Sequence, residues 1–183
     1  MLHLIPSLIL GCYEIYPRLI SDERGSFVKV FNKDVFEKLN LATNFLEEFY
    51  TISKKNSIRG LHFQIPPHDH IKIVYCTHGE VFDVVLDLRV GSPTYGKTAV
   101  FNLSAALGNY LYIPKGLAHG FCALSDDATL VYKVGSVYSP AHDTGVHPMS
   151  VAIEWPTVAP IISKRDLSLI PYSDFLSPFL YEG

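Results

Sequence analysis

Short runs of alternating apolar and polar residues fill the chain from residue 71 to residue 134. Alternation with a period of two is typical of strands with one buried face, because successive side chains of a strand point to opposite sides. Turn-forming residues such as His78-Gly79 and Gly91-Ser92-Pro93 separate the runs at intervals of about 8–12 residues. The predicted strands are 71–76, 80–89, 97–103, 110–113, 119–124 and 129–134.

The chain before residue 71 mixes strand patterns with one helix pattern. Residues 32–39 predict a helix, because Asn32 or Asp34 can cap its start and three apolar side chains share one face. A turn is expected at 21–25, between β-rich stretches. Strands are predicted at 8–20, where Gly11 and Pro17 interrupt the pattern, at 26–31 and at 45–53.

Many short strands with almost no helix between them predict an all-β fold. An antiparallel jelly-roll β-sandwich or barrel, with short helices and an irregular C-terminal segment after residue 140, accounts for the pattern. The sequence contains no internal repeat, linker or low-complexity tract. We therefore expect residues 1–183 to form a single domain.

Composition narrows the class of protein. The 183 residues are 48% hydrophobic and 18% charged, which is typical of a globular domain, and the net charge of −3 favours neither a nucleic-acid nor a membrane partner. Cys12, Cys76 and Cys122 follow no metal-site or disulfide spacing and suit a reducing compartment. The first residues lack the basic region of a signal peptide. We expect a cytoplasmic protein.

The stretch Arg59-Gly60-Leu61-His62-Phe63-Gln64 carries the first candidate chemistry. Strict alternation places residues 60, 62 and 64 on one face of a strand and residues 59, 61 and 63 on the other. A half-buried imidazole beside an open glycine backbone suits proton transfer, so His62 is a candidate general base. The alternative is a core histidine whose nitrogens are hydrogen-bonded internally.

Three histidines, His68, His70 and His119, raise the possibility of a metal site. The stretch from Gly108 to His119 is similar to the second metal motif of cupins. The first cupin motif needs a Glu shortly after His-x-His, and residues 73–75 are Ile, Val and Tyr. Because a 2-His-1-carboxylate site needs that oxygen ligand, the sequence predicts no metal, and nothing in it calls for another cofactor.

Several further residues are candidates for binding or catalysis, provided that the strands bring their side chains close together. Arginine suits a diphosphate and lysine a single anionic oxygen. Tyr132 either packs in the core or donates a proton into a pocket, and Asp166 in Ser-Lys-Arg-Asp is either a turn residue or a functional carboxylate. Each basic residue alone is typical of a solvated surface charge, but in a barrel some of the set would converge on the mouth. The set is Arg24, Arg59, Lys72, Lys115 and Lys133.

Together these stretches resemble the dTDP-4-dehydrorhamnose 3,5-epimerase family of nucleotide-sugar enzymes. The resemblance implies a cupin-like jelly roll that works without a metal on a nucleotide-diphosphate 4-keto sugar. It also implies a homodimer with crossed N-terminal segments, so we expect an interface near residues 8–31. The matching stretches are DERGSF (22–27), RGLHFQIPP (59–67), residues 71–96, LYIPKGLAHGF (111–121), VYKVGSVYSP (131–140), IEWP (153–156) and ISKRD (162–166).

The resemblance also implies roles for individual residues. His62 would remove a proton next to the 4-keto group, and Asp166 would accept the other N–H of its imidazole. Lys72 would stabilise the enolate oxygen, and Tyr132 would return a proton from the opposite face. The implied substrate-binding residues are Arg59 and Arg24 for the diphosphate, with Arg24 supplied by the partner subunit, Phe27 and Tyr138 for the base, and His119 and Gln64 in the pocket.

Three departures from the family pattern leave the substrate open. Lys29 replaces a usual Glu, His70 replaces a usual Gln or Glu, and residues 49–51 replace a polar Asn and its neighbours. Because all three would lie at the ligand-binding rim, the nucleotide, the sugar and the choice of C3, C5 or both stay undecided. The alternatives are a nucleotide-sugar 3,4-ketoisomerase and a non-catalytic sugar-binding jelly roll.

Overall fold

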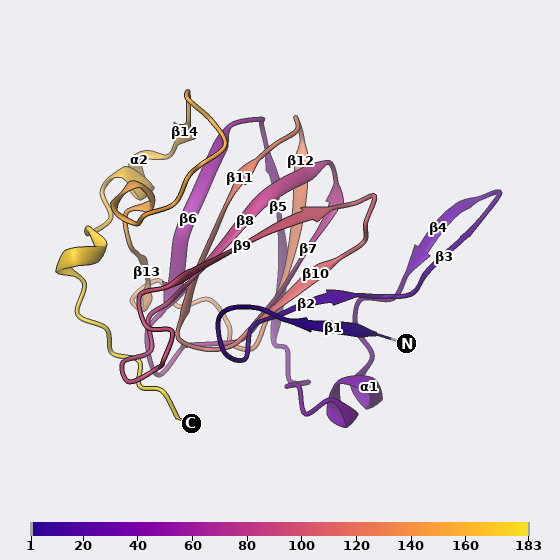
Figure 1. The fold of residues 1–183 in the computed structure, drawn as a ribbon, viewed down its shortest axis with the longest axis horizontal. Coiled ribbons are helices and arrows are strands. Elements are labelled where there is room, and N and C mark those ends of the chain that lie inside the picture. The colour runs from indigo at the N-terminus through magenta and orange to yellow at the C-terminus, as the bar shows by residue number, and fades with distance from the viewer. Residues whose placement is uncertain (1, 183) are drawn as a thin grey trace.

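The computed structural model describes residues 2–182 and consists mainly of two antiparallel sheets packed as a jelly roll (Figure 1). The first sheet is antiparallel throughout, and its central strands carry alternating side chains that face the second sheet. Its strands, in spatial order, are β1 (His3–Pro6), β2 (Tyr13–Tyr16), β10 (Tyr110–Ile113), β7 (Lys72–His78), β12 (Ala128–Val134) and β5 (Glu47–Ser53).

The second sheet carries the stretch that contains His62. Its strands run in the order β13 (Asp143–Gly145), β6 (Ser57–Gln64), β11 (Leu117–Ala123), β8 (Glu80–Asp87) and β9 (Thr98–Ser104). A short strand, β14 (Ile161–Ile162), pairs with β6 in the parallel direction. The predicted fold class is confirmed, and the C-terminal segment adds a short parallel strand pairing to it.

The main core lies between the two sheets, because both contribute buried side chains to one cluster. Val74 and Leu130 come from the first sheet, and Val85 and Phe121 come from the second. All four side chains are at most 1% exposed. Burying such apolar side chains is the main favourable contribution to folding, so this cluster holds the sheets together.

The N-terminal region differs in detail from its predicted strands. Residues 8–11 form a turn between β1 and β2, where Gly11 takes a φ of +78° that favours glycine. Farther along, β3 (Leu19–Asp22) and β4 (Gly25–Val28) form a hairpin that projects away from the body (Figure 1). The predicted turn shortens to residues 23–24, because its flanking residues pair.

The predicted helix is confirmed as α1 (Lys33–Lys38), and the other helices are single turns. The side-chain oxygen of Asn32 accepts the backbone N–H of Val35 at 3.1 Å and caps the start of α1. The short helices are η1 (Pro148–Ser150), α2 (Lys164–Leu167) and η2 (Tyr172–Asp174). Within residues 2–182, we find no helix with both the length and the apolar character that crossing a membrane requires.

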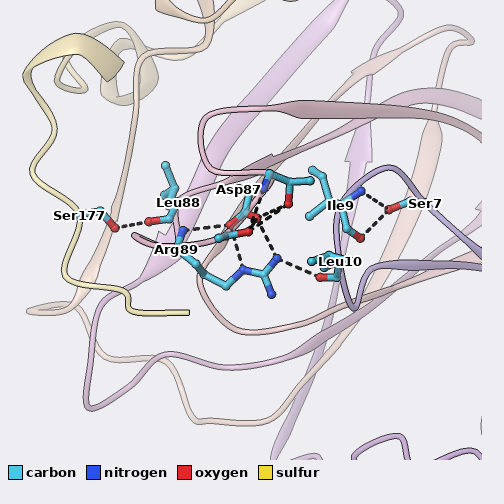
Figure 2. Close-up of polar contacts among 9 residues, drawn as sticks. Ser7, Ile9, Leu10, Asp87, Leu88, Arg89 and Ser177 are labelled. Carbon is cyan, nitrogen blue, oxygen red and sulfur yellow. Dashed lines mark hydrogen bonds and ion pairs between the residues drawn. The ribbon is translucent and has the colours of Figure 1, made fainter. Parts of the chain in front are cut away.

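Hydrogen bonds at and next to one buried ion pair link three distant parts of the chain (Figure 2). The guanidinium of Arg89 donates to both carboxylate oxygens of Asp87, at 2.9 and 2.8 Å, and to the backbone oxygen of Leu10 at 2.9 Å. Nearby, the hydroxyl of Ser177 donates to the backbone oxygen of Leu88. The network thus anchors the N-terminal turn and the C-terminal segment at the end of β8.

The C-terminal segment lies along the β6 side of the second sheet (Figure 1). Residues 161–162 pair with the start of β6, and α2 follows directly. The backbone bridges between Val146 and Ile170 and between Val90 and Leu180 hold the rest of this segment against the body. The segment therefore brings residues near 166 next to the middle of β6.

Candidate active site

A cavity of about 340 Å³ opens between the two sheets and is lined by both. Six of the polar side chains on its wall come from four strands at the middle of the jelly roll. They are Arg59, His62 and Gln64 from β6, Lys72 from β7, His119 from β11 and Tyr132 from β12. With Tyr138, which also lines the cavity, the fold gathers seven of the ten predicted site residues around one space.

A bulge in β6 directs both Arg59 and His62 toward the cavity. His62 pairs with His119 and Arg59 pairs with Phe121, so β6 uses one more residue than β11 over the same stretch. Strict alternation, which placed Arg59 and His62 on opposite faces, is therefore wrong here. Gly60 takes a φ of +131°, and a Cβ at that position would lie 2.5 Å from the Cα of Gly120. Only glycine allows this approach.

His62 and Asp166 form a hydrogen-bonded pair at the cavity wall. The Nε2 atom of His62 lies 2.8 Å from the Oδ1 atom of Asp166, which is 3% exposed. The Oδ2 atom of Asp166 accepts the backbone N–H of Gly60 at 3.3 Å. Ser163 caps α2 by accepting the backbone N–H of Asp166 at 3.0 Å, which fixes the position of the carboxylate.

The environment of Asp166 favours its ionised form. Burial alone raises the pKa of a carboxyl group, but here the hydrogen bonds and the charge of His62 outweigh it, helped by the Gly60 N–H. The pKa of Asp166 is consequently lowered below its ordinary value. An ionised Asp166 can only accept hydrogen bonds, so the Nε2 atom of His62 carries a proton and Nδ1 is left as the basic nitrogen.

Lys72 holds its ammonium group beside His62. Its Nζ atom donates to the backbone oxygen of His62 at 3.1 Å. Burial lowers the pKa of Lys72 to about 8, although the charges of Asp143 and Asp83 act in the opposite direction. At neutral pH the group is therefore still mostly cationic, and its partial desolvation strengthens its attraction for an anionic oxygen.

His119 forms a second, more deeply buried pair with Asp83. The Nε2 atom of His119 lies 2.8 and 3.0 Å from the two carboxylate oxygens, and the two residues are 4% and 0% exposed. Burial raises the pKa of Asp83, and the contact with His119 offsets part of that rise. Asp83 was not among the predicted site residues. Its only sequence signal is a lone carboxylate inside the apolar run of β8.

Tyr132 stands on the wall opposite β6, held by two aromatic contacts. Its ring stacks on Phe49 with centroids 4.8 Å apart and planes 13° apart, and it meets the His119 ring edge-on at 5.9 Å. Tyr132 is 7% exposed, and burial raises the pKa of its phenol well above the ordinary value. The phenol is therefore protonated over the whole neutral range and is able to donate.

Polar contacts fix the rim of the cavity. Arg59 donates through Nε to Ser53 Oγ at 2.9 Å, and the backbone N–H of Tyr138 donates to Glu47 Oε2 at 2.8 Å. The side chain of Tyr138 is 56% exposed at this rim. Cavity-lining residues that the sequence analysis missed are Glu47, Asp143, Ser136 and Arg165, of which Arg165 donates to Asp143 at 2.6 Å.

Arg24 and Phe27 lie apart from this cavity within one chain. Both belong to the projecting β3–β4 hairpin, and neither lines the cavity. Arg24 pairs with Asp22 at 2.5 Å, and Phe27 is 58% exposed. Their predicted contact with substrate therefore requires that a second subunit bring its hairpin to the cavity.

One ring nitrogen of His70 and one of His119 contact protein groups at the cavity. The Nδ1 atom of His70 lies 2.7 Å from Ser136 Oγ, and the Nε2 atom of His119 is held by Asp83. Among residues 2–182, no three His, Cys, Asp or Glu side chains are arranged to hold a metal ion.

Comparison with known proteins gives a consistent result. Residues 6–174 match the model of a family described as dTDP-4-dehydrorhamnose 3,5-epimerase. A dTDP-4-dehydrorhamnose 3,5-epimerase from Shigella flexneri is 43% identical over 83% of this chain and 86% of its own length. A dTDP-4-dehydrorhamnose 3-epimerase from Streptomyces niveus is 41% identical over 90% of this chain and 81% of its own.

A solved structure extends the likeness to the whole chain. The crystal structure of the dTDP-6-deoxy-D-glucose-3,5-epimerase from Legionella pneumophila was determined in complex with dTDP-4-keto-L-rhamnose. It matches this chain with a TM-score of 0.95 and 32% identity, and covers 100% of both chains.

Proposed function

The chain belongs to the dTDP-4-dehydrorhamnose 3,5-epimerase family, and on that premise we propose that it inverts one or both carbon centres flanking the ketone of a dTDP-linked 4-keto-6-deoxy sugar. The observation that carries the proposal is the His62–Asp166 pair, which faces Lys72 and Tyr132 around a single cavity. The activity is that of an isomerase in deoxysugar biosynthesis, and polysaccharide formation is the process we propose for its product.

The first step is removal of a proton from the carbon next to the ketone. Because Asp166 binds Nε2 of His62, the lone pair on Nδ1 is free to take this proton. The C–H bonding electrons move into the new C=C bond, and the ketone oxygen becomes an enolate. The ionised Asp166 then stabilises the imidazolium ion that His62 has become.

The second group in the mechanism is Lys72, which stabilises the enolate. Its ammonium already lies near the base through its hydrogen bond to the His62 backbone oxygen. Negative charge grows on the ketone oxygen only as the proton leaves, so a fixed cation at that point lowers the barrier more than it tightens substrate binding. The partly buried position of Lys72 makes that interaction stronger than it would be in water.

Inversion requires a proton from the opposite face of the sugar. Tyr132 lies on the first sheet, whereas His62 lies on the second, and both line the same cavity. The phenol transfers its proton to the enolate carbon, and the enolate electrons re-form the ketone. The His119 ring, held by Asp83, lies beside the Tyr132 ring and lines the same cavity.

We also propose that the functional unit is a homodimer. The β3–β4 hairpin exposes 42% of Leu19, 48% of Ile20 and 58% of Phe27, which is apolar surface that a partner would cover. The partner subunit's Arg24 would then join Arg59 at the diphosphate, and the partner subunit's Phe27 would face Tyr138 across the base. Sedimentation velocity tests this: a monomer at micromolar concentration contradicts it.

Two further properties belong to the same proposal. The reaction needs no metal or other cofactor, because the acid–base groups named above supply each proton step; activity that is lost on dialysis against a chelator and restored by a divalent ion contradicts this. A cytoplasmic location fits the three cysteines, which are free and buried.

Proton exchange tests the proposed function directly. The enzyme is incubated in D2O with 4-keto-6-deoxy sugars linked to dTDP, CDP or GDP, and NMR follows deuterium at C3 and C5. We expect incorporation into the dTDP-linked sugar, with inversion at each exchanged centre that the enzyme acts on. A ketoisomerase instead moves the carbonyl to C3, and a non-catalytic binding protein leaves every carbon-bound proton in place.

A further inference from the structure

His70 lies on the cavity wall two residues before Lys72. Its imidazole offers a ligand either an N–H or a bare nitrogen, depending on the tautomer. The hydrogen bonds around His70 decide between the two.

Ser136 fixes the proton on the Nδ1 atom of His70. The Oγ atom of Ser136 lies 2.7 Å from the backbone oxygen of His68 and 2.7 Å from Nδ1 of His70. A hydroxyl has one hydrogen, and a carbonyl oxygen can only accept, so Ser136 donates to His68. The contact with His70 then needs its hydrogen from the ring, which makes Nδ1 the protonated nitrogen.

Gln64 is compatible with this assignment. Its Oε1 atom accepts the backbone N–H of Ser139 at 2.6 Å, which fixes the orientation of the amide. The Nε2 atom can donate its two hydrogens to the backbone oxygen of His68 at 3.0 Å and to Ser136 Oγ at 3.1 Å. Its 3.2 Å contact with Nδ1 of His70 is therefore not needed to satisfy the amide.

The His70 ring is neutral as well as oriented. Burial, together with the charge of Lys72, lowers its pKa to about 3. A neutral ring with a proton on Nδ1 has a bare lone pair on Nε2. Among residues 2–182, no hydrogen bond involves this nitrogen, and His70 is one of the residues that line the cavity.

We propose that His70 is a specificity residue whose Nε2 atom accepts a hydrogen bond from a hydroxyl group of the bound sugar. This rests on the proposed function, because it takes a nucleotide sugar as the occupant of the cavity. Phosphate oxygens and the ketone oxygen carry no proton to donate, so the bare nitrogen disfavours them. His70 lines the same cavity as Lys72, whose charge acts on the His70 ring.

The tautomer is tested first, by long-range ¹H–¹⁵N NMR of the imidazoles at neutral pH. We expect His70 to show a protonated Nδ1 and a bare Nε2 in the wild-type protein. In Ser136→Ala, Gln64 can donate to Nδ1, so the proton should move to Nε2. The matched control is Ser139→Ala, which removes the 2.8 Å contact between Ser139 and His142 and should leave His70 unchanged. A protonated Nε2 in the wild type overturns the proposal.

The sugar contact is tested by calorimetry with three ligands that have no reactive ketone: dTDP-glucose, its 2-deoxy analogue and its 3-deoxy analogue. The analogue that lacks the hydroxyl bound by His70 should bind the wild type up to about tenfold more weakly than dTDP-glucose does. This is the loss expected for one neutral hydrogen bond. His70→Phe and Ser136→Ala should both abolish that difference. An equal difference in wild type and His70→Phe overturns the sugar contact, as does a tenfold loss of plain dTDP binding in His70→Phe.

The outcomes separate this proposal from the function on which it rests. If the wild type binds no dTDP-linked compound and exchanges no proton in D2O, the proposed function fails, whatever the tautomer of His70. If exchange proceeds but the three ligands show no His70-dependent difference, the function stands and the specificity role is wrong.

Discussion

The Nε2 atom of His62 lies 2.8 Å from Oδ1 of Asp166, although 104 positions of sequence separate the two residues. The other oxygen of the same carboxylate accepts the N–H of Gly60, inside the bulge that turns His62 toward the cavity. One side chain of the C-terminal segment therefore fixes both the ring and the backbone that carries it. The mechanism depends on this attachment.

Asp166→Asn should keep the fold but lose most of the rate. The asparagine amide can donate to Nε2 of His62, which moves the ring proton to Nδ1 and removes the base. A drop of roughly 10²- to 10⁴-fold in the rate of proton exchange is expected for a misassigned tautomer. NMR in D2O measures it. Asp126→Asn, which changes a carboxylate that accepts the Lys55 N–H, is the control and should retain full activity.

Lys72 should give the reaction an alkaline limit. Because burial lowers its pKa to about 8, the ammonium is present below that pH and is lost above it. The exchange rate should therefore fall as pH rises through about 8. The pH dependence of stability has the opposite sign. The unfolded chain keeps the Lys72 proton up to a higher pH than the folded chain does. The free energy of unfolding should therefore rise as pH rises from the folded to the unfolded pKa of Lys72.

The Lys72→Met variant tests whether Lys72 causes the fall in exchange rate above about pH 8. Lys72→Met should be slow at every pH and should lack the fall near pH 8, because no ammonium remains to titrate. Circular dichroism at each pH checks that the protein stays folded. Persistence of the same alkaline fall in Lys72→Met shows that another group causes it and removes Lys72 from its assigned role.

Tyr132→Phe should separate exchange from inversion. His62 still removes the proton and can return deuterium to the same face, so wash-out continues, while inversion slows by roughly 10²- to 10⁴-fold. Phe49→Leu is the matched control, since it removes the ring stacked on Tyr132 but keeps the phenol. It should lower stability by about 0.5–1.5 kcal/mol and leave inversion coupled to exchange. Equal losses of exchange and inversion in Tyr132→Phe contradict the assignment.

The Asp87–Arg89 pair should matter for stability and not for chemistry. Arg89→Leu leaves the carboxylate of Asp87 buried without its cation, which costs about 3–5 kcal/mol in comparable buried pairs. The free energy of unfolding in urea measures this loss. Arg18→Leu makes the same change at an exposed position and should have a small effect. Because neither residue lines the cavity, the folded variants should bind dTDP-glucose alike.

The strands and the single longer helix could be predicted because their signals are local. Alternation along 128–134 survives in the burial of β12, and Asn32 caps α1 where its side-chain chemistry indicates. In β8 the alternation is lost, because residues 83–87 are all buried. The bulge at Gly60 could not be predicted, because it arises from the close approach of β6 to β11 and leaves no repeating pattern in either strand.

The candidate site was predictable only in part, for the same reason. His62, Lys72 and Tyr132 lie in motifs that the family resemblance covers, and the structure brings them together. Asp83 was missed because its role depends on a diagonal contact with a neighbouring strand, where His119 itself pairs with Val85. The positions of Arg24 and Phe27 relative to substrate depend on a second subunit, which the fold of one chain does not decide.

The most direct test of the central claim is the exchange of carbon-bound protons by His62→Ala in D2O. Wild-type enzyme and variant are incubated with dTDP-4-keto-6-deoxyglucose, and NMR follows deuterium at C3 and C5, with dTDP-glucose binding as the control for an intact pocket. The account predicts that the variant still binds dTDP-glucose and exchanges neither proton above the rate in buffer. Exchange near the wild-type rate in this variant contradicts the assignment of His62 as the base.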